Sequence, residues 1–146
     1  MYFLEIASLN TLAHRDRIMY DRLIAMKFVL ITKDSEMERE AREGFHPSDT
    51  FDCFSDWEEG LAAGGGADLM FLDLLATLDE PHKIAGYEKF AQAKMNHGTS
   101  SKIPLVLISP PEDYELDFMA GWPDFIFANI RRPVTFKHFR RASTWV

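Results

Sequence analysis

The sequence predicts a doubly wound α/β domain, in which helices cover both faces of a five-stranded parallel sheet. Three short apolar runs, at residues 26–32, 67–73 and 103–108, end on polar groups and are separated by helical patterns. Runs of this length are typical of strands buried on both faces. The carboxyl ends of parallel strands meet at one edge of the sheet. We therefore expect Asp34, Asp73 and Ser109 to lie in one crevice.

The other predicted elements complete five β-α units. Strands are expected at about residues 27–32, 50–54, 67–73, 103–108 and 124–128. Helices are expected at about residues 35–44 and 86–95, and a further one should follow Pro110-Pro111. Two more helices should begin at caps: one at Ser55, which has capping-box spacing to Glu58, and the last at Thr135. Gly64-Gly65-Gly66 precedes a strand and lacks a following Lys-Ser/Thr pair, which favours a turn over a phosphate loop. Two helices should cover one face of the sheet and three the other.

Composition limits the classes of function. A chain of 146 residues with 47% hydrophobic residues fits one globular domain with a sizeable core. Its net charge of −7 disfavours nucleic-acid binding, and the basic stretch 131–141 is interpreted as the solvated face of a last helix. No run approaches the ~20 apolar residues of a membrane span, and no secretory signal is evident. Cys53, the single cysteine, excludes an internal disulfide and suits a reducing cytoplasm.

Residues 1–25 differ from the domain that follows at 26–146. The stretch 15–25 has helical character, with Met19 and Leu23 one turn apart. No strand of the predicted sheet requires this extension. Two interpretations remain open: a helical arm used for pairing or docking, or a sequence upstream of a domain that begins at Met26.

The order and spacing of these features resemble the receiver domains of two-component response regulators. Asp73 stands at the position of the aspartate that takes a phosphoryl group from a histidine kinase, Ser109 at the hydroxyl position, and Pro133 at the proline of a Lys-Pro pair. Gly86 and Asp124-Phe125 also match the family pattern. The resemblance implies a flavodoxin-like, CheY-like (βα)5 fold over about residues 26–146, with an extra N-terminal segment.

Three departures concern the phosphorylation site of that family. In place of the acid pair that holds Mg²⁺ in the family, this chain has Lys33-Asp34. The lysine of the Lys-Pro pair is replaced by Arg132, and a few extra residues stand between the predicted last strand and this arginine. Pro110, which follows Ser109, lacks the N–H that would contact the phosphoryl group. We expect Lys33 to pair with Asp73 or Asp34 in place of the metal. Asp34 and Asp73 should then bind Mg²⁺ weakly, in the millimolar range or weaker, and no other cofactor is expected.

These features predict a non-enzymatic, cytoplasmic pseudo-receiver that works mainly as a protein-interaction module. Its partner would be a histidine kinase, a phosphotransfer protein or a downstream effector, and homodimer formation is left open. The family's usual interaction surface would carry Tyr114, Phe118, Trp122 and Phe125. The alternative is a conventional single-domain phosphoacceptor in a phosphorelay, using Asp73 with Ser109 and Arg132. A small enzyme on this scaffold is disfavoured, because the sequence offers no nucleophile–base pair, and the five histidines are interpreted as isolated surface residues.

Overall fold

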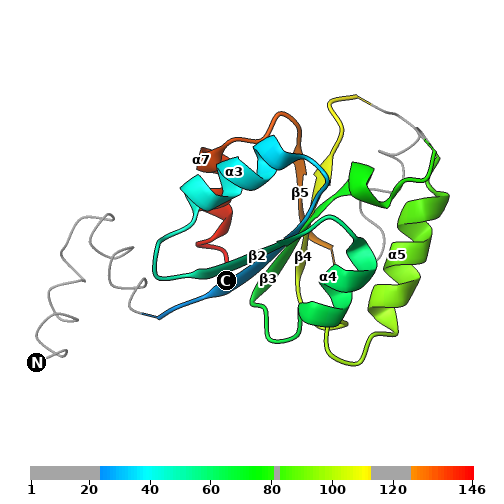
Figure 1. Cartoon of the computed structure of the whole chain (residues 1–146), viewed down its shortest axis with the longest axis horizontal. Coiled ribbons are helices and arrows are strands. Elements are labelled where there is room, and N and C mark those ends of the chain that lie inside the picture. The colour runs from blue at the N-terminus through cyan, green and yellow to red at the C-terminus, as the bar shows by residue number, and fades with distance from the viewer. Residues whose placement is uncertain (1–23, 81–82, 113–125) are drawn as a thin grey trace, which may run out of the picture.

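The computed structural model describes residues 24–80, 83–112 and 126–146 of the chain. Five strands form one fully parallel sheet in the order β2-β1-β3-β4-β5, which confirms the predicted doubly wound architecture (Figure 1). The strands are β1 (Lys27–Ile31), β2 (Thr50–Phe54), β3 (Leu69–Asp73), β4 (Leu105–Ser109) and β5 (Ile126–Arg131). All residues of β3 and β4 are buried, as expected for strands that helices cover on both faces.

Four described helices cover the sheet, two on each face. On one face lie α3 (Ser35–Gly44) and α7 (Phe136–Ala142), and on the other α4 (Trp57–Ala63) and α5 (Ala85–Met95) (Figure 1). A short 3-10 helix, η1 (Leu74–Thr77), follows β3 directly and was not predicted. The helix expected after Pro110-Pro111 lies outside the described residues. None of the helices in the described ranges is long and apolar enough to cross a membrane.

Each face of the sheet has its own apolar core. Under α3 and α7 the core is aromatic: the Phe45 ring stacks on Phe28 at 4.5 Å between centroids, and Phe139 contacts Phe71 at 5.3 Å. Under α4 and α5 it is mostly aliphatic, with Phe90 and Trp57 in an edge-to-face contact at 5.7 Å. Burial on both faces fixes the register of the central strands, because a one-residue slip would exchange the side chains of the two cores.

The prediction of the last strand was wrong at its C-terminal end. The sequence predicted residues 124–128, followed by extra residues before Arg132, whereas β5 runs from Ile126 to Arg131. A register shift opposite Leu105 and Val106 leaves Phe127 without a partner, since Leu105 pairs with Ile126 and Val106 with Ala128. The apparently extra residues therefore belong to the strand, which a bulge accommodates. The Asp124-Phe125 pair lies outside the described residues.

Helix starts agree with the predictions to within about one residue. α4 is capped by Asp56, whose carboxylate accepts the amide of Glu58 at 3.2 Å, and not by the expected Ser55. Thr135 caps α7 as predicted, and the Nδ1 atom of His138 accepts the backbone N–H of Thr135 at 3.0 Å. His138 is therefore part of a capping box, which corrects its interpretation as an isolated residue. Phe136 is only partly buried at the first position of this helix, whereas Phe139 is fully buried.

Candidate functional site

Four polar side chains gather where the strands end. Asp34 follows β1 and caps α3, accepting the amides of Glu36 and Met37 at 3.0 and 3.3 Å. Asp73 is the last residue of β3, and Ser109 is the last residue of β4. Arg132 comes directly after β5, and its backbone N–H donates to the carbonyl oxygen of Ser109 at 2.9 Å. Parallel pairing thus brings residues that are far apart in the sequence to one edge of the sheet.

The guanidinium group of Arg132 joins the two carboxylates. Its Nη1 lies 3.0 Å from Oδ2 of Asp34, and its Nη2 lies 2.7 Å from Oδ2 of Asp73. The Arg132 side chain is 20% exposed, so water screens these contacts less than it would at the open surface. The expected juxtaposition of Asp34 and Asp73 is confirmed, but the cation between them comes from the end of β5.

Asp73 is almost completely enclosed. The residue is 2% exposed, and its Oδ2 accepts a hydrogen bond of 2.7 Å from the hydroxyl of Thr32 in addition to that from Arg132. Its Oδ1 accepts the amide of Leu75 at 3.3 Å. Both carboxylate oxygens therefore have donors, as a buried charge requires. The carboxylate is therefore shielded from solvent and already held by three donors.

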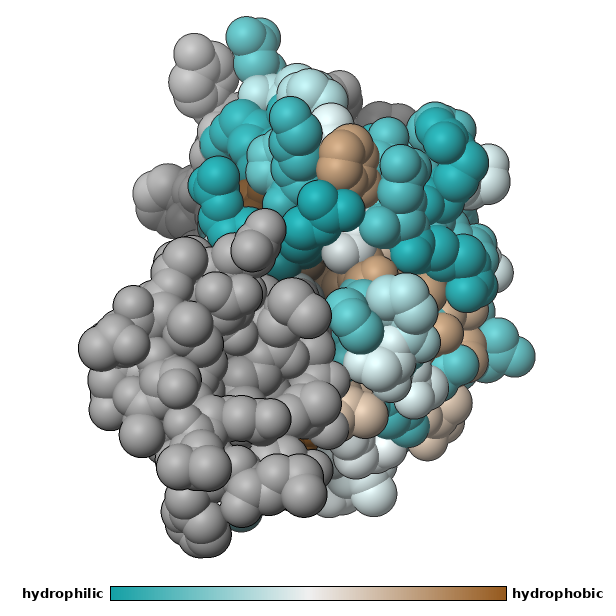
Figure 2. Space-filling model, turned by 90° about the vertical axis from the view of Figure 1, so that its left-hand side faces the viewer, coloured by the Kyte–Doolittle hydropathy of each residue, from teal (hydrophilic) through white to brown (hydrophobic). Residues whose placement is uncertain are grey.

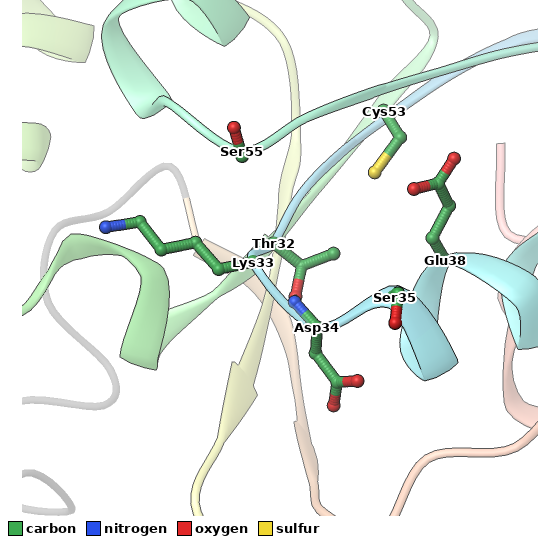
Figure 3. A pocket seen from close by; sticks show the side chains of 7 residues that line it. All are labelled: Thr32, Lys33, Asp34, Ser35, Glu38, Cys53 and Ser55. Atoms are coloured by element: carbon green, nitrogen blue, oxygen red, sulfur yellow. The ribbon is translucent and has the colours of Figure 1, made fainter.

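The expectation that Lys33 pairs with Asp73 or Asp34 is wrong. Lys33 is exposed, and its side chain extends away from the carboxylate of Asp34 (Figure 3). The alternation of a strand explains this: buried Thr32 points to Asp73, so the next residue projects to the other side. Among the described residues, the ion pairs of Asp34 and Asp73 are with Arg132.

Ser109 is engaged by a residue that the sequence analysis did not single out. Its hydroxyl donates to Oδ1 of Asn129 in β5 at 2.7 Å. The neighbouring Arg131 donates from Nη1 to the carbonyl oxygens of Pro110 and Pro111 at 2.9 and 3.1 Å, and so holds the segment that leaves β4. The two arginines thus have separate tasks, one at the carboxylates and one at the backbone.

The charges in this cluster favour each other's ionised forms. Burial would raise the pKa of Asp34, but the hydrogen bond from Arg132 and those from the amides of Met37 and Glu36 outweigh it, and the pKa is lowered. Burial likewise opposes the charge of Arg132, whereas Asp73 and Asp34 raise its pKa above the ordinary value. Asp34 and Arg132 are therefore both ionised at neutral pH.

A polar pocket of about 250 Å³ opens beside the cluster but does not reach Asp73. Figure 3 shows the side chains that line it: Thr32, Lys33, Asp34, Ser35, Glu38, Cys53 and Ser55. Cys53 is only partly buried. Burial of its thiol, with Glu38 nearby, raises its pKa to about 12, so it remains protonated and unreactive.

The donor set does not suit a magnesium ion in this arrangement. Mg²⁺ needs oxygen ligands in near-octahedral geometry, and the two carboxylates at the strand ends already share a guanidinium. Within the described ranges no group of three or more His, Cys, Asp or Glu side chains is placed to hold a metal ion. Asp34 and Asp73 would have to lose Arg132 before they could act as metal ligands.

Three residues of the cluster escaped the sequence analysis: Thr32, Asn129 and Arg131. In the sequence Thr32 is only the polar end of an apolar run. Its role depends on a hydrogen bond to Asp73, which lies 41 residues away in the sequence, so no local pattern indicates it. Asn129 fell among the residues taken as extra before Arg132, and Arg131 was counted in the basic stretch 131–141. A strand reading of residues 126–131, based on the alternation of the sequence, would have placed both on one face of β5.

Comparisons with known proteins identify the fold. Neither a family model nor a curated protein sequence matches the chain. Solved structures do match, and several are response-regulator receiver domains, so the fold is the CheY-like receiver fold. The identities are too low to show more than the fold.

Three of these structures illustrate the likeness. A chemotaxis response regulator of Vibrio cholerae superimposes with a TM-score of 0.64 at 11% identity, over 83% of this chain and 98% of that one. A phosphorylated cyanobacterial phytochrome response regulator gives 0.58 at 16% identity, over 82% and 89%. A bacteriophytochrome response regulator gives 0.57 at 20% identity, over 83% and 77%.

Proposed function

We propose that this chain is an atypical receiver domain that acts in two-component signal transduction mainly as a protein-interaction module. One observation carries the proposal: Arg132 bridges Asp34 and Asp73 at 3.0 and 2.7 Å. These two residues stand at the metal and phosphoacceptor positions of the receiver pattern. An arginine of the same chain therefore supplies the positive charge that a metal ion would otherwise bring.

Phosphoryl transfer depends on positioning and on neutralising charge around the transferred group. Here the Asp73 carboxylate has donors on both oxygens, the hydroxyl of Ser109 is directed to Asn129, and the residue after Ser109 is a proline without an N–H. Each feature removes a part of the machinery that would hold an incoming phosphoryl group. The same contacts hold the ends of β1, β3 and β5 in one arrangement, which suits a constitutive docking surface.

The partners follow from the class of protein. In this proposal the domain binds a histidine kinase, a phosphotransfer protein or an effector in the cytoplasm, and it catalyses no reaction of its own. The aromatic surface expected from the sequence, with Tyr114, Phe118, Trp122 and Phe125, lies outside the described residues.

The decisive experiment compares Mg²⁺ binding and phosphorylation in wild type and Arg132→Ala. Wild type should show Mg²⁺ binding no tighter than millimolar by calorimetry, and no added phosphate by intact mass after acetyl phosphate and Mg²⁺. Arg132→Ala frees two carboxylates, so its Mg²⁺ affinity should rise by about tenfold or more, equivalent to ~1.4 kcal/mol.

Arg131→Ala is the matched control, because it removes a neighbouring arginine whose Nη1 donates to the backbone carbonyl oxygens of Pro110 and Pro111. It should bind Mg²⁺ as wild type does. Lys33→Asp should also change little while Arg132 stays in place, because Lys33 points away from the carboxylates. Stoichiometric phosphorylation of wild-type Asp73 would overturn the proposal and identify a conventional phosphoacceptor.

A further inference from the structure

A second pocket, the α3–β2 pocket, lies at the opposite end of the strands from the carboxylate cluster. It has a volume of about 380 Å³ and is lined by Arg42, Phe45, His46, Pro47, Asp49 and Phe51. The rings of Phe45 and Phe51 lie 5.3 Å apart, and the guanidinium of Arg42 lies 4.9 Å from the Phe51 ring. The pocket thus offers aromatic and apolar surface between charged side chains, a combination common in binding sites.

The chain enters the domain beside this pocket. The backbone N–H of Met26 donates to Oδ1 of Asp49, a pocket residue, at 3.0 Å, and the N–H of Thr50 donates to the carbonyl oxygen of Met26 at 2.8 Å. In Figure 1 the start of β1 accordingly lies next to the turn that joins α3 to β2. The entry point of the N-terminal segment, residues 1–23, is therefore anchored to the wall of the pocket.

The sequence that enters the domain is rich in apolar residues. Ile24 is 69% exposed, and Met19, Tyr20 and Leu23 precede it in the sequence. Leu23 is three residues from Met26, so it lies within ~10 Å of the anchored backbone. The described surface on this side is mainly hydrophilic, with smaller apolar areas between (Figure 2). An apolar segment tethered here would gain most by covering the aromatic surface of the pocket.

We propose that the N-terminal segment docks on its own domain, with the side chains of Met19 and Leu23 seated in the α3–β2 pocket. The short tether favours this occupant over others, because it gives the segment an effective concentration in the millimolar range. Even a contact that would be weak between separate molecules is then substantially formed. The proposal is independent of the function assigned to the carboxylate cluster.

The test uses amide NMR spectra of the full chain. Met19→Ser/Leu23→Ser should shift the resonances of residues 45–51 selectively, while those of the central strands stay unchanged. The matched control, Ile6→Ser/Leu9→Ser, removes two apolar side chains from the far part of the same segment and should leave residues 45–51 unaffected. As a reciprocal check, Pro47→Ala should shift the resonances of Met19 and Leu23.

Each outcome decides between occupants. Selective shifts that do not change when the protein is diluted support docking within one chain. Shifts that vanish on dilution would mean that a second copy supplies the segment, and would overturn the proposal as stated. Equal shifts in both double variants, or none at residues 45–51, would also overturn it and leave the pocket to another partner.

Discussion

At the scale of single residues, the direction and shape of a side chain determine which cation binds Asp34 and Asp73. Lys33 is adjacent to Asp34 in the sequence, yet it is exposed, whereas Arg132 arrives from 98 residues away. The planar guanidinium presents several donors in a fixed fork and can serve two carboxylates at once, which a single ammonium does less well. The cluster therefore depends on an arginine rather than on any positive charge nearby.

Thr32 should contribute to stability through its hydroxyl. It donates to buried Asp73 at 2.7 Å and accepts the backbone N–H of Asp34 at 3.0 Å. Thr32→Val keeps the shape but leaves a buried carboxylate oxygen short of a donor, which should cost about 1–3 kcal/mol of unfolding free energy. Urea denaturation measures the loss. Thr32→Ser, which restores the hydroxyl, should recover most of it, and equal losses in both variants would argue against the hydrogen bond.

Because of Lys94, the unfolding free energy should change with pH in the alkaline range. Its side chain is 0% exposed and donates to the carbonyl oxygen of Ile103 at 2.6 Å, and burial lowers its pKa from 10.5 to about 8. Between these two values the unfolded chain binds more protons than the folded one, so the unfolding free energy should rise with pH.

The size of this effect is obtained by comparison with Lys94→Met, which cannot titrate. Relative to that variant, wild type should gain stability on the order of 2 kcal/mol between pH 8 and pH 10.5. Thermal or urea unfolding at a series of pH values measures the difference. A constant difference across this range would show that the amine is not protonated differently in the two states.

At the scale of elements, α5 packs against η1 so closely that a glycine is required. A Cβ atom on Gly86 would stand 1.9 Å from the carbonyl oxygen of Thr77, a backbone atom that cannot step aside. Gly86→Ala should therefore destabilise the domain by about 3 kcal/mol or more.

Gly98→Ala is the control for that substitution, because a Cβ there meets nothing within 4 Å, and it should change stability by less than ~0.5 kcal/mol. Chemical denaturation of both variants compares the two sites. Similar stabilities for the two would mean that η1 can move away from α5.

The pairing of α3 with α7 rests on contacts of the same kind. A Cβ on Gly44 would stand 2.4 Å from the carbonyl oxygen of Phe136, and the carboxylate of Glu40 accepts the amide of Phe136 at 2.8 Å. Glu40 thus satisfies one of the free N–H groups at the start of α7, where a negative charge is also favoured by the helix dipole. These two residues fix the position of the helix that follows Arg132.

At the scale of the whole molecule, the cluster ties β1, β3 and the end of β5 together, and acid should loosen it. The pKa of Asp34 is lowered from its ordinary value of 3.8, chiefly by contacts that outweigh its burial. Its contribution to stability is therefore full above that value and is lost as pH falls through the lower, folded pKa.

Asp34→Asn isolates this contribution, because asparagine is an equally good helix cap but carries no charge for Arg132. Wild type should be the more stable of the two at neutral pH, and the difference should shrink as pH falls below about 4. Unfolding measured from pH 7 to pH 2 follows the difference. A gap that stays constant through this range would show that the ion pair contributes nothing.

The architecture could be deduced from local patterns in the sequence. Buried parallel strands need nearly continuous apolar runs, helix starts need caps such as Asp34 and Thr135, and these signals lie within a few residues of the elements they specify. The positions of Asp34, Asp73 and Ser109 followed as well, because polar residues after parallel strands share one edge of the sheet.

The partners of those residues were decided only by the tertiary structure. Pairing across strands depends on register and on which face each side chain takes, and a single bulge beside Val106 sets both for β5. That bulge brought Asn129 to Ser109, and Arg132 after β5 reached the two carboxylates, while strand alternation turned Lys33 away from them. Such contacts span 20 to 98 residues, a distance over which the local pattern of a sequence carries no information about geometry.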